Sequence, residues 1–310
     1  MIKRTLYFSN PAYLSVRDEQ LIIKFPEIEK NDTLPESFKK DQQRSVPIED
    51  IGVIILDNRQ ITLTHGVLEK LLDNNCAVIT CNSNRMPYGL MLPLSGNTLQ
   101  SERFRHQIDA TLPLKKQLWQ QTIAAKIENQ GLVLKELRGC ETGNMFQWAS
   151  KVRSGDPENL EARAAAYYWS QLFSQYPDFT RKREGVWPNI LLNYGYAILR
   201  AIVARGLVGT GLLPTLGIHH HNRYNAYCLA DDIMEPYRPF VDRLVFELTQ
   251  KFQGEELAKE LKAELLQIPV LDVRINERRS PLMVAVNTTT TSLYKCYSGE
   301  NRKIIYPRID

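Results

Sequence analysis

The sequence predicts an α+β fold, in which a small β-rich N-terminal domain (residues 1–96) precedes a larger, mainly α-helical domain (residues 97–310). Short runs rich in β-branched residues occur within the first hundred residues, and beyond them apolar residues recur with the 3.6-residue period of helices. Residues 93–101, between the two regions, have the composition of a linker. A chain of 310 residues that is 43% hydrophobic can build two packed domains.

The N-terminal domain is expected to contain a sheet with one helix packed against it. Four short apolar runs read as strands, at residues 13–16, 20–25, 53–56 and 77–80. The first two flank a polar turn at residues 17–19. Between the last two, Thr64 opens a segment whose leucines and valine recur at helical spacing, which predicts the helix.

The second domain is expected to consist mainly of helices. Apolar periodicity predicts them near residues 101–110, 113–130, 132–140, 157–175, 188–205, 226–250 and 254–267. The four threonines at residues 288–291 have flanks that fit either a helix or a strand.

Composition excludes several classes of protein. No run approaches the roughly 18 uninterrupted apolar residues that a membrane-spanning helix needs, and the first ten residues lack the apolar segment of a signal peptide, so we expect a cytoplasmic protein without a membrane partner. Five cysteines without CxxC spacing suggest neither a disulfide framework nor a zinc ribbon. A net charge of +4 permits a polyanionic partner without identifying one.

Glu161 is the first candidate site residue. Asp156 is a good N-cap and Pro157 suits a first helical position, so a helix should start there. Counted from Glu161, apolar residues follow at four, seven and eleven positions, which places the carboxylate on the buried face. A buried carboxylate needs a partner, and an ion pair with an arginine such as Arg200 is the alternative to metal binding.

Three adjacent histidines, residues 219–221, follow an apolar helix in a polar loop. Alternate side chains of an extended loop diverge, so either His220 or the pair of His219 and His221 faces a given site. Neutral imidazole is a common ligand for transition-metal ions, although histidines in loops are often only solvated or structural.

Asp232 and Glu235 form the third candidate element, three residues apart on one side of a predicted helix. Two acids on one face either repel each other or share a cation. Pro236 disfavours helical geometry at Glu235, so a kink is expected to re-aim that side chain. The alternative is an acidic helix start that interacts with the macrodipole. Together the three elements supply carboxylate, imidazole and carboxylate, a set suited to Mg²⁺ or Mn²⁺.

Four stretches of the sequence resemble the CRISPR-associated integrase family, which carries out spacer acquisition, in its type II form. They are residues 159–169 (NLEARAAAYYW), 189–201 (NILLNYGYAILRA), 211–225 (GLLPTLGIHHHNRYN) and 232–242 (DIMEPYRPFVD). Their order and separations also match, and the similarity covers nearly the whole chain.

The resemblance implies a metal-dependent DNA endonuclease and integrase that works as a homodimer. In this family two such dimers flank a central dimer of a small adaptation partner protein, forming a heterohexamer, and the β-rich domain serves dimerisation and partner binding. The family's metal ligands and catalytic residues carry over onto Glu161, His220 and Glu235. In some members the position of Asp232 also contributes. The triple histidine is a departure from the family pattern, and it makes His219 the alternative ligand.

The implied reaction inserts short duplex DNA into a CRISPR array by attack of a 3′-hydroxyl on a phosphodiester of the repeat. Arg163, Arg223 and Arg238 lie beside the ligand motifs and are the candidates for DNA binding, although Arg238 has equal claim to an ion pair with Glu235. Two other functions fit the residues: a non-catalytic helical nucleic-acid-binding scaffold, and a Mn²⁺-dependent hydrolase of small phosphate esters.

Overall fold

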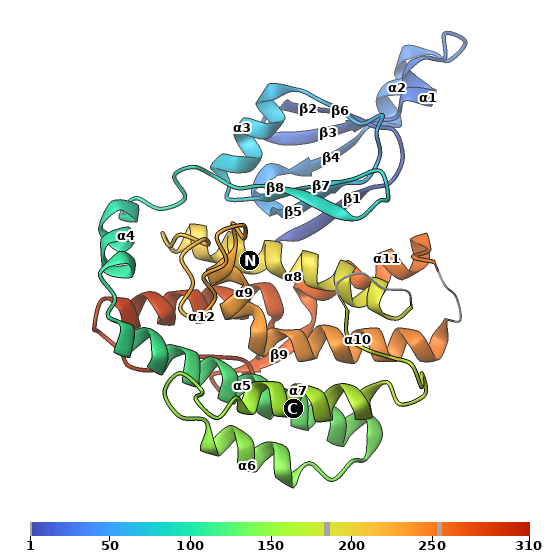
Figure 1. Ribbon diagram of the computed structural model, residues 1–310. Helices are drawn as coiled ribbons and strands as arrows, with labels where there is room; N and C mark the ends of the chain where they lie inside the picture. The colour runs from blue at the N-terminus through green and yellow to red at the C-terminus, as the bar shows by residue number, and fades with distance from the viewer. Residues whose placement is uncertain (1, 183–186, 253–255) are drawn as a thin grey trace. The chain divides into compact units, whose positions relative to one another are not determined.

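The computed structural model describes residues 2–182, 187–252 and 256–310. The chain divides into two compact units, Met1–Gly96 and Asn97–Asp310 (Figure 1). The division falls inside the segment expected to be a linker. The first unit is β-rich and the second mainly helical, which confirms the predicted α+β class.

Two four-stranded sheets form the first unit. One sheet has the strand order β1 (Arg4–Phe8), β5 (Ile51–Leu56), β7 (Ala77–Cys81) and β8 (Pro87–Met91). Its first three strands are parallel, and β8 runs antiparallel to β7. The other sheet has the order β4 (Arg44–Pro47), β3 (Gln20–Lys24), β2 (Tyr13–Arg17) and β6 (Thr62–Leu63).

The polar turn at residues 17–19 joins β2 and β3 as an antiparallel hairpin. Asp18 and Glu19 both adopt positive φ angles, 50° and 56°, as a two-residue hairpin turn of this hand requires. Helix α3 (His65–Asp73) follows Thr64 as predicted and buries Val67 and Leu71 against the apolar residues of the sheets. The sequence prediction missed β1, β4, β6 and β8, and also the short elements α1 (Pro26–Glu29), α2 (Glu36–Asp41) and η1 (Ile48–Asp50).

The second unit packs helices around α8 (Asn189–Gly209). The other helical segments are α4 (Gln100–Ile108), α5 (Leu112–Arg138), α6 (Gly143–Lys151), α7 (Leu160–Leu172), α9 (Cys228–Met234), η2 (Glu235–Tyr237), α10 (Arg238–Lys251), α11 (Lys259–Leu265), η3 (Ile268–Val270) and α12 (Leu282–Tyr297). Of these, α8 contacts α9, α10, α11, α12 and η3. A hairpin of β9 (Asp272–Ile275) and β10 (Arg278–Pro281) completes the unit. Helix α8 is long and apolar enough to cross a membrane, but most of it is buried, as in the core helix of a soluble protein.

Several predicted helix boundaries were wrong. The helices expected at 113–130 and 132–140 form one continuous helix, α5, which ends at Arg138. It runs through Gly131, against which the side chains of Met145 and Phe146 pack closely. The helix expected at 226–250 is interrupted by the 3₁₀ turn η2, where Pro236 removes a backbone donor. The four threonines at 288–291 lie in α12. Of the helix expected at 254–267, residues 254 and 255 lie outside the described residues, and α11 covers 259–265.

A buried carboxyl group lies in the core of the helical unit. Asp242 on α10 is 1% exposed and accepts hydrogen bonds from the hydroxyl groups of Tyr168 and Tyr196. Burial raises the pKa of Asp242 to about 7, and the two tyrosine hydrogen bonds oppose this only in part.

Asp242→Asn tests this assignment. A carboxyl group whose folded-state pKa exceeds its unfolded value stabilises the fold at low pH, and this contribution is lost as the pH rises through 7. We therefore expect the free energy of unfolding of wild type, relative to that of Asp242→Asn, to fall by about 2 kcal/mol between pH 5 and pH 8. Urea unfolding at both pH values measures the free energies of unfolding of the two proteins. A gap between wild type and Asp242→Asn that is the same at pH 5 and pH 8 would contradict the assignment.

Gly195→Ala tests the packing of α8. A Cβ atom at Gly195 would lie 2.6 Å from Cγ1 of Val241 and 3.3 Å from Cδ1 of Ile268. We expect this substitution to lower the free energy of unfolding by about 1–3 kcal/mol, since the core has no room for the methyl group. The control is Gly143→Ala, where no atom lies within 4 Å and no loss of stability is expected.

Candidate metal centre

Glu161 lies in the first turn of α7. The carboxylate of Asp156 accepts hydrogen bonds from the backbone N–H groups of Leu160 and Glu161, at 3.0 and 2.9 Å. Asp156 therefore satisfies free donors at the helix start as predicted, although α7 begins at Leu160 and not at Pro157. This hydrogen bonding holds the backbone of Glu161 in place.

Glu235 is the first residue of η2, the turn between α9 and α10. Its side chain is only 7% exposed, so its charge needs partners. Asn129 on α5 helps to hold this turn, because its Nδ2 donates to the carbonyl oxygen of Pro236 at 2.8 Å. The same nitrogen donates to the carbonyl oxygen of Pro307 at 3.0 Å, which ties the turn to the C-terminal segment.

The carboxylates of Glu161 and Glu235 converge on the ammonium group of Lys126, from α5. Nζ of Lys126 lies 2.6 Å from Oε1 of Glu161 and 2.7 Å from Oε2 of Glu235. The lysine is 8% exposed. Burial disfavours its charge, but the carboxylates of Glu235 and Glu161 outweigh this effect and raise the pKa of Lys126. The two candidate acids are thus brought together around one cation.

The ion pair considered between Glu161 and Arg200 is not formed. Arg200 instead binds Asp231, with Nε 2.6 Å from Oδ1. The second cation beside the acids is Arg238, whose Nε lies 2.9 Å from Oε1 of Glu235 and whose guanidinium lies over the ring of Tyr196. Burial would raise the pKa of Glu235, but Arg238 and Lys126 hold it below its ordinary value, so this carboxylate is ionised.

Asp232, on α9, binds the histidine loop through its carboxylate. Its fully buried carboxylate accepts hydrogen bonds from the backbone N–H groups of Ile218 and His219, at 2.8 and 2.9 Å. The same carboxylate lies 2.5 Å from Nδ1 of His220. Gly217 makes this approach possible, because a Cβ atom there would lie 2.8 Å from Oδ2 of Asp232.

The expectation that neighbouring histidines face opposite sides was wrong, because His219 and His220 both contact the ring of Trp119 and their own ring centroids lie 5.2 Å apart. His219 stacks on the buried ring of Trp119, with ring centroids 4.1 Å apart and planes within 2°. His220 lies edge-on to the same ring and is half-exposed. Asp232 raises the pKa of His220 through their hydrogen bond, and the carboxylates of Glu235 and Glu161 act in the same direction. His220 therefore lies within electrostatic range of both acids.

Within residues 2–182, 187–252 and 256–310, no three His, Cys, Asp or Glu side chains are grouped closely enough to hold a metal ion as they stand. The donor set nevertheless fits a divalent cation. Glu161 and Glu235 already share one cation, and His220, whose Nδ1 is engaged by Asp232, has its Nε2 left as the ligating atom. Two carboxylates and an imidazole suit Mg²⁺ or Mn²⁺.

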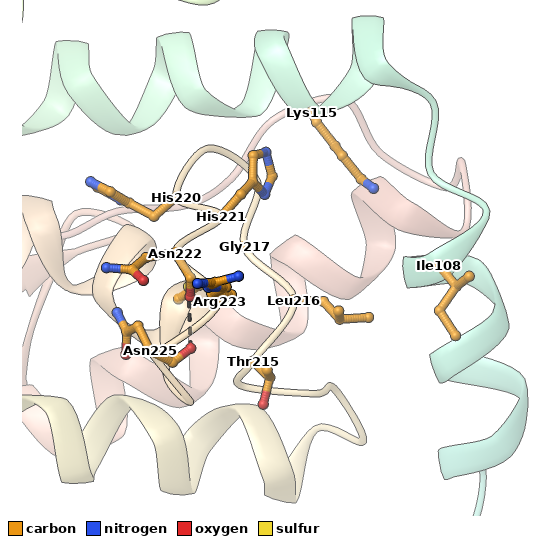
Figure 2. A pocket seen from close by; sticks show the side chains of 11 residues that line it. Ile108, Lys115, Thr215, Leu216, Gly217, His220, His221, Asn222, Arg223 and Asn225 are labelled. Carbon is orange, nitrogen blue, oxygen red and sulfur yellow. Dashed lines mark hydrogen bonds between the residues drawn. The ribbon is translucent and has the colours of Figure 1, made fainter.

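A cavity of about 410 Å³ opens beside the histidine loop. Figure 2 shows the loop side chains around it, with Lys115 and Ile108 reaching in from the helices opposite. His220, His221 and Arg223 line the cavity together with Lys115. Its walls thus combine cationic and imidazole groups with the apolar side chains of Ile108 and Leu216.

The three arginines considered for DNA binding occupy different environments. Arg223 is exposed at the cavity and lies over the ring of Tyr224. Arg163 is exposed on α7 and lies over the ring of Trp148. Arg238 is engaged by Glu235, as its spacing in the sequence suggested.

Sequence reasoning missed the three residues that α5 contributes to the centre. Trp119 and Lys126 are two helical turns apart on one face of the helix, and Asn129 follows one turn later. The available signal was a lysine and an asparagine on a face that also carries Ile123, Ile127 and Gln130, because polar residues on a buried face need partners.

Comparisons with known proteins confirm the resemblance found in the sequence. The family model for CRISPR associated protein Cas1 matches residues 6–266. The CRISPR-associated endonuclease Cas1 of Neisseria meningitidis serogroup C (strain 8013) is 34% identical over 310 residues, which cover 98% of this chain and 95% of the relative.

Two solved structures have the same fold. A casposase bound to integration product gives a TM-score of 0.76 at 20% identity, covering 98% of this chain and 92% of the casposase. A chain of a Cas6-RT-Cas1–Cas2 complex gives a TM-score of 0.73 at 17% identity; the match covers 100% of this chain and 36% of the chain in the complex. With the family model matching most of its length, this chain belongs to the Cas1 family of CRISPR-associated proteins.

Proposed function

We propose that this chain is a divalent-metal-dependent DNA endonuclease and integrase that inserts short duplex DNA into a CRISPR array. The observation that carries the proposal is the convergence of Glu161 and Glu235, from two separate helical segments, on one cation within electrostatic range of His220. Membership of the Cas1 family and the shared fold with a casposase bound to integration product support the same function.

Glu161, Glu235 and His220 are the proposed ligands of Mg²⁺ or Mn²⁺. Asp232 contacts Nδ1 of His220 and so leaves the opposite ring nitrogen free to serve as a ligand; we assign Asp232 this positioning role in preference to direct ligation. His219, the alternative ligand, is stacked on Trp119, which favours His220. The bound ion would polarise the attacked phosphate and offset the charge that develops on the leaving oxygen.

The reaction exchanges one phosphodiester for another. The 3′-oxygen of the incoming duplex forms a bond to phosphorus while the bond to the leaving 3′-oxygen of the repeat breaks, and the proton passes from the attacking to the leaving hydroxyl group. Water in place of the attacking hydroxyl group gives strand cleavage at the same site. We propose that Arg223 and Lys115, which line the cavity beside His220, and Arg163, which is exposed on α7, hold backbone phosphates.

The proposed partners are double-stranded DNA, a second copy of this chain and a small adaptation partner protein, assembled as a heterohexamer in the cytoplasm. The Cas6-RT-Cas1–Cas2 complex among the structural matches supports a Cas2-type partner. The chain's mild positive charge of +4 is compatible with a polyanionic substrate.

Strand transfer of a labelled short duplex into supercoiled DNA bearing a CRISPR repeat tests the function. With Mn²⁺ and the partner protein, we expect Glu161→Ala, His220→Ala and Glu235→Ala to lower the rate on the order of 100-fold or more, because each substitution removes a ligand. DNA binding should remain, since these side chains do not hold the phosphates.

Glu158→Ala is the matched control, because Glu158 is exposed three residues before Glu161 and pairs with Arg153. It should keep full activity. DNA binding that is indifferent to metal, with no transfer by wild type, would favour the scaffold hypothesis. Hydrolysis of small phosphate esters without any requirement for duplex DNA or the partner would favour the hydrolase.

A further inference from the structure

Lys126 holds the position between the two acids that a divalent cation would need. Its ammonium group contacts Oε1 of Glu161 at 2.6 Å and Oε2 of Glu235 at 2.7 Å. Bonds from Mg²⁺ to oxygen are shorter than these contacts by about half an ångström, so the same two oxygens could bind an ion there after small movements. The lysine and the ion cannot occupy this position together.

The charges around the acids explain why a lysine lies there. Glu235 is buried and has two cations within contact distance, Lys126 and Arg238. Glu161, which is about one-quarter exposed, contacts the same lysine. Without a counter-charge two neighbouring carboxylates repel each other, and burial makes ionisation of Glu235 costly. Lys126 supplies the shared counter-charge in the absence of metal.

We propose that Lys126 is an internal counter-ion that assembles the two ligands in the metal-free protein and is displaced from between them when the divalent cation binds. This inference rests on the metal site of the proposed function. The four-carbon side chain of Lys126 allows its ammonium group to move away without movement of α5. Lys126 therefore lowers metal affinity while it stabilises the metal-free fold.

The proposal is tested by Lys126→Met, which keeps most of the length of the side chain and removes its charge. Lys135→Met is the matched control, because Lys135 is exposed on the same helix. We measure the dissociation constant of Mn²⁺ by calorimetry and the melting temperature with and without Mn²⁺, for the full chain.

We expect Lys126→Met to melt several degrees lower than wild type without metal, because the two acids lose their shared cation. It should bind Mn²⁺ at least about 10-fold more tightly, since a competing positive charge is removed. Its melting temperature should therefore rise more on addition of Mn²⁺ than that of wild type. Lys135→Met should match wild type in all three measurements.

Unchanged or weaker Mn²⁺ binding by Lys126→Met would overturn the proposal. If Glu161→Gln still abolished Mn²⁺ binding in that case, the metal site of the proposed function would stand. Absence of Mn²⁺ binding to wild type and Lys126→Met alike would overturn the metal site and this proposal together. If Lys126→Met did not fold, Lys126→Gln, which keeps a hydrogen-bond donor without the charge, would give the same comparison.

Discussion

Glu161 and Glu235 place two negative charges against one ammonium group in the helical unit, and the surrounding structure depends on the balance of these charges. Unpaired, a carboxylate as buried as that of Glu235 would be protonated or would destabilise the fold. Lys126 and Arg238 keep the centre ionised and compact without any bound ion. The fold thus holds two carboxylates around one cation, at the position that we propose for the divalent ion.

The neighbouring elements determine where these charges lie. Helix α5 acts as a common support, since Trp119 holds the histidine loop, Lys126 contacts both acids and Asn129 binds the turn after Glu235. Glu235 keeps helical dihedral angles (φ −53°, ψ −47°), so the expected departure from helical geometry before Pro236 was wrong. Asp232 ties the loop to α9. Each proposed ligand is therefore held by a different element, and two of the three lie on helical segments, which are more rigid than loops.

The sequence was sufficient to predict the α+β class. Local signals drew attention to Glu161, to the three histidines at 219–221 and to Glu235, whereas the choice of His220 came from the family resemblance, and its role as a ligand stays a prediction. Lys126 could not be found in this way, because its role depends on two residues far along the chain. The continuity of α5 through Gly131 was also missed, since glycine disfavours helices and the close packing of Met145 and Phe146 against it cannot be read from the sequence. The strands β1, β4, β6 and β8 were missed because they are short or lack strict alternation of apolar and polar residues. They are strands by virtue of their pairing with neighbouring strands.

The most direct test of the account is pulsed electron paramagnetic resonance of Mn²⁺ bound to protein in which the histidines carry ¹⁵N. The account predicts one Mn²⁺ per chain with coupling to a single imidazole nitrogen, lost in His220→Ala and kept in His221→Ala. Coupling that persists in His220→Ala, or its absence from wild type, would contradict the ligand set of Glu161, His220 and Glu235.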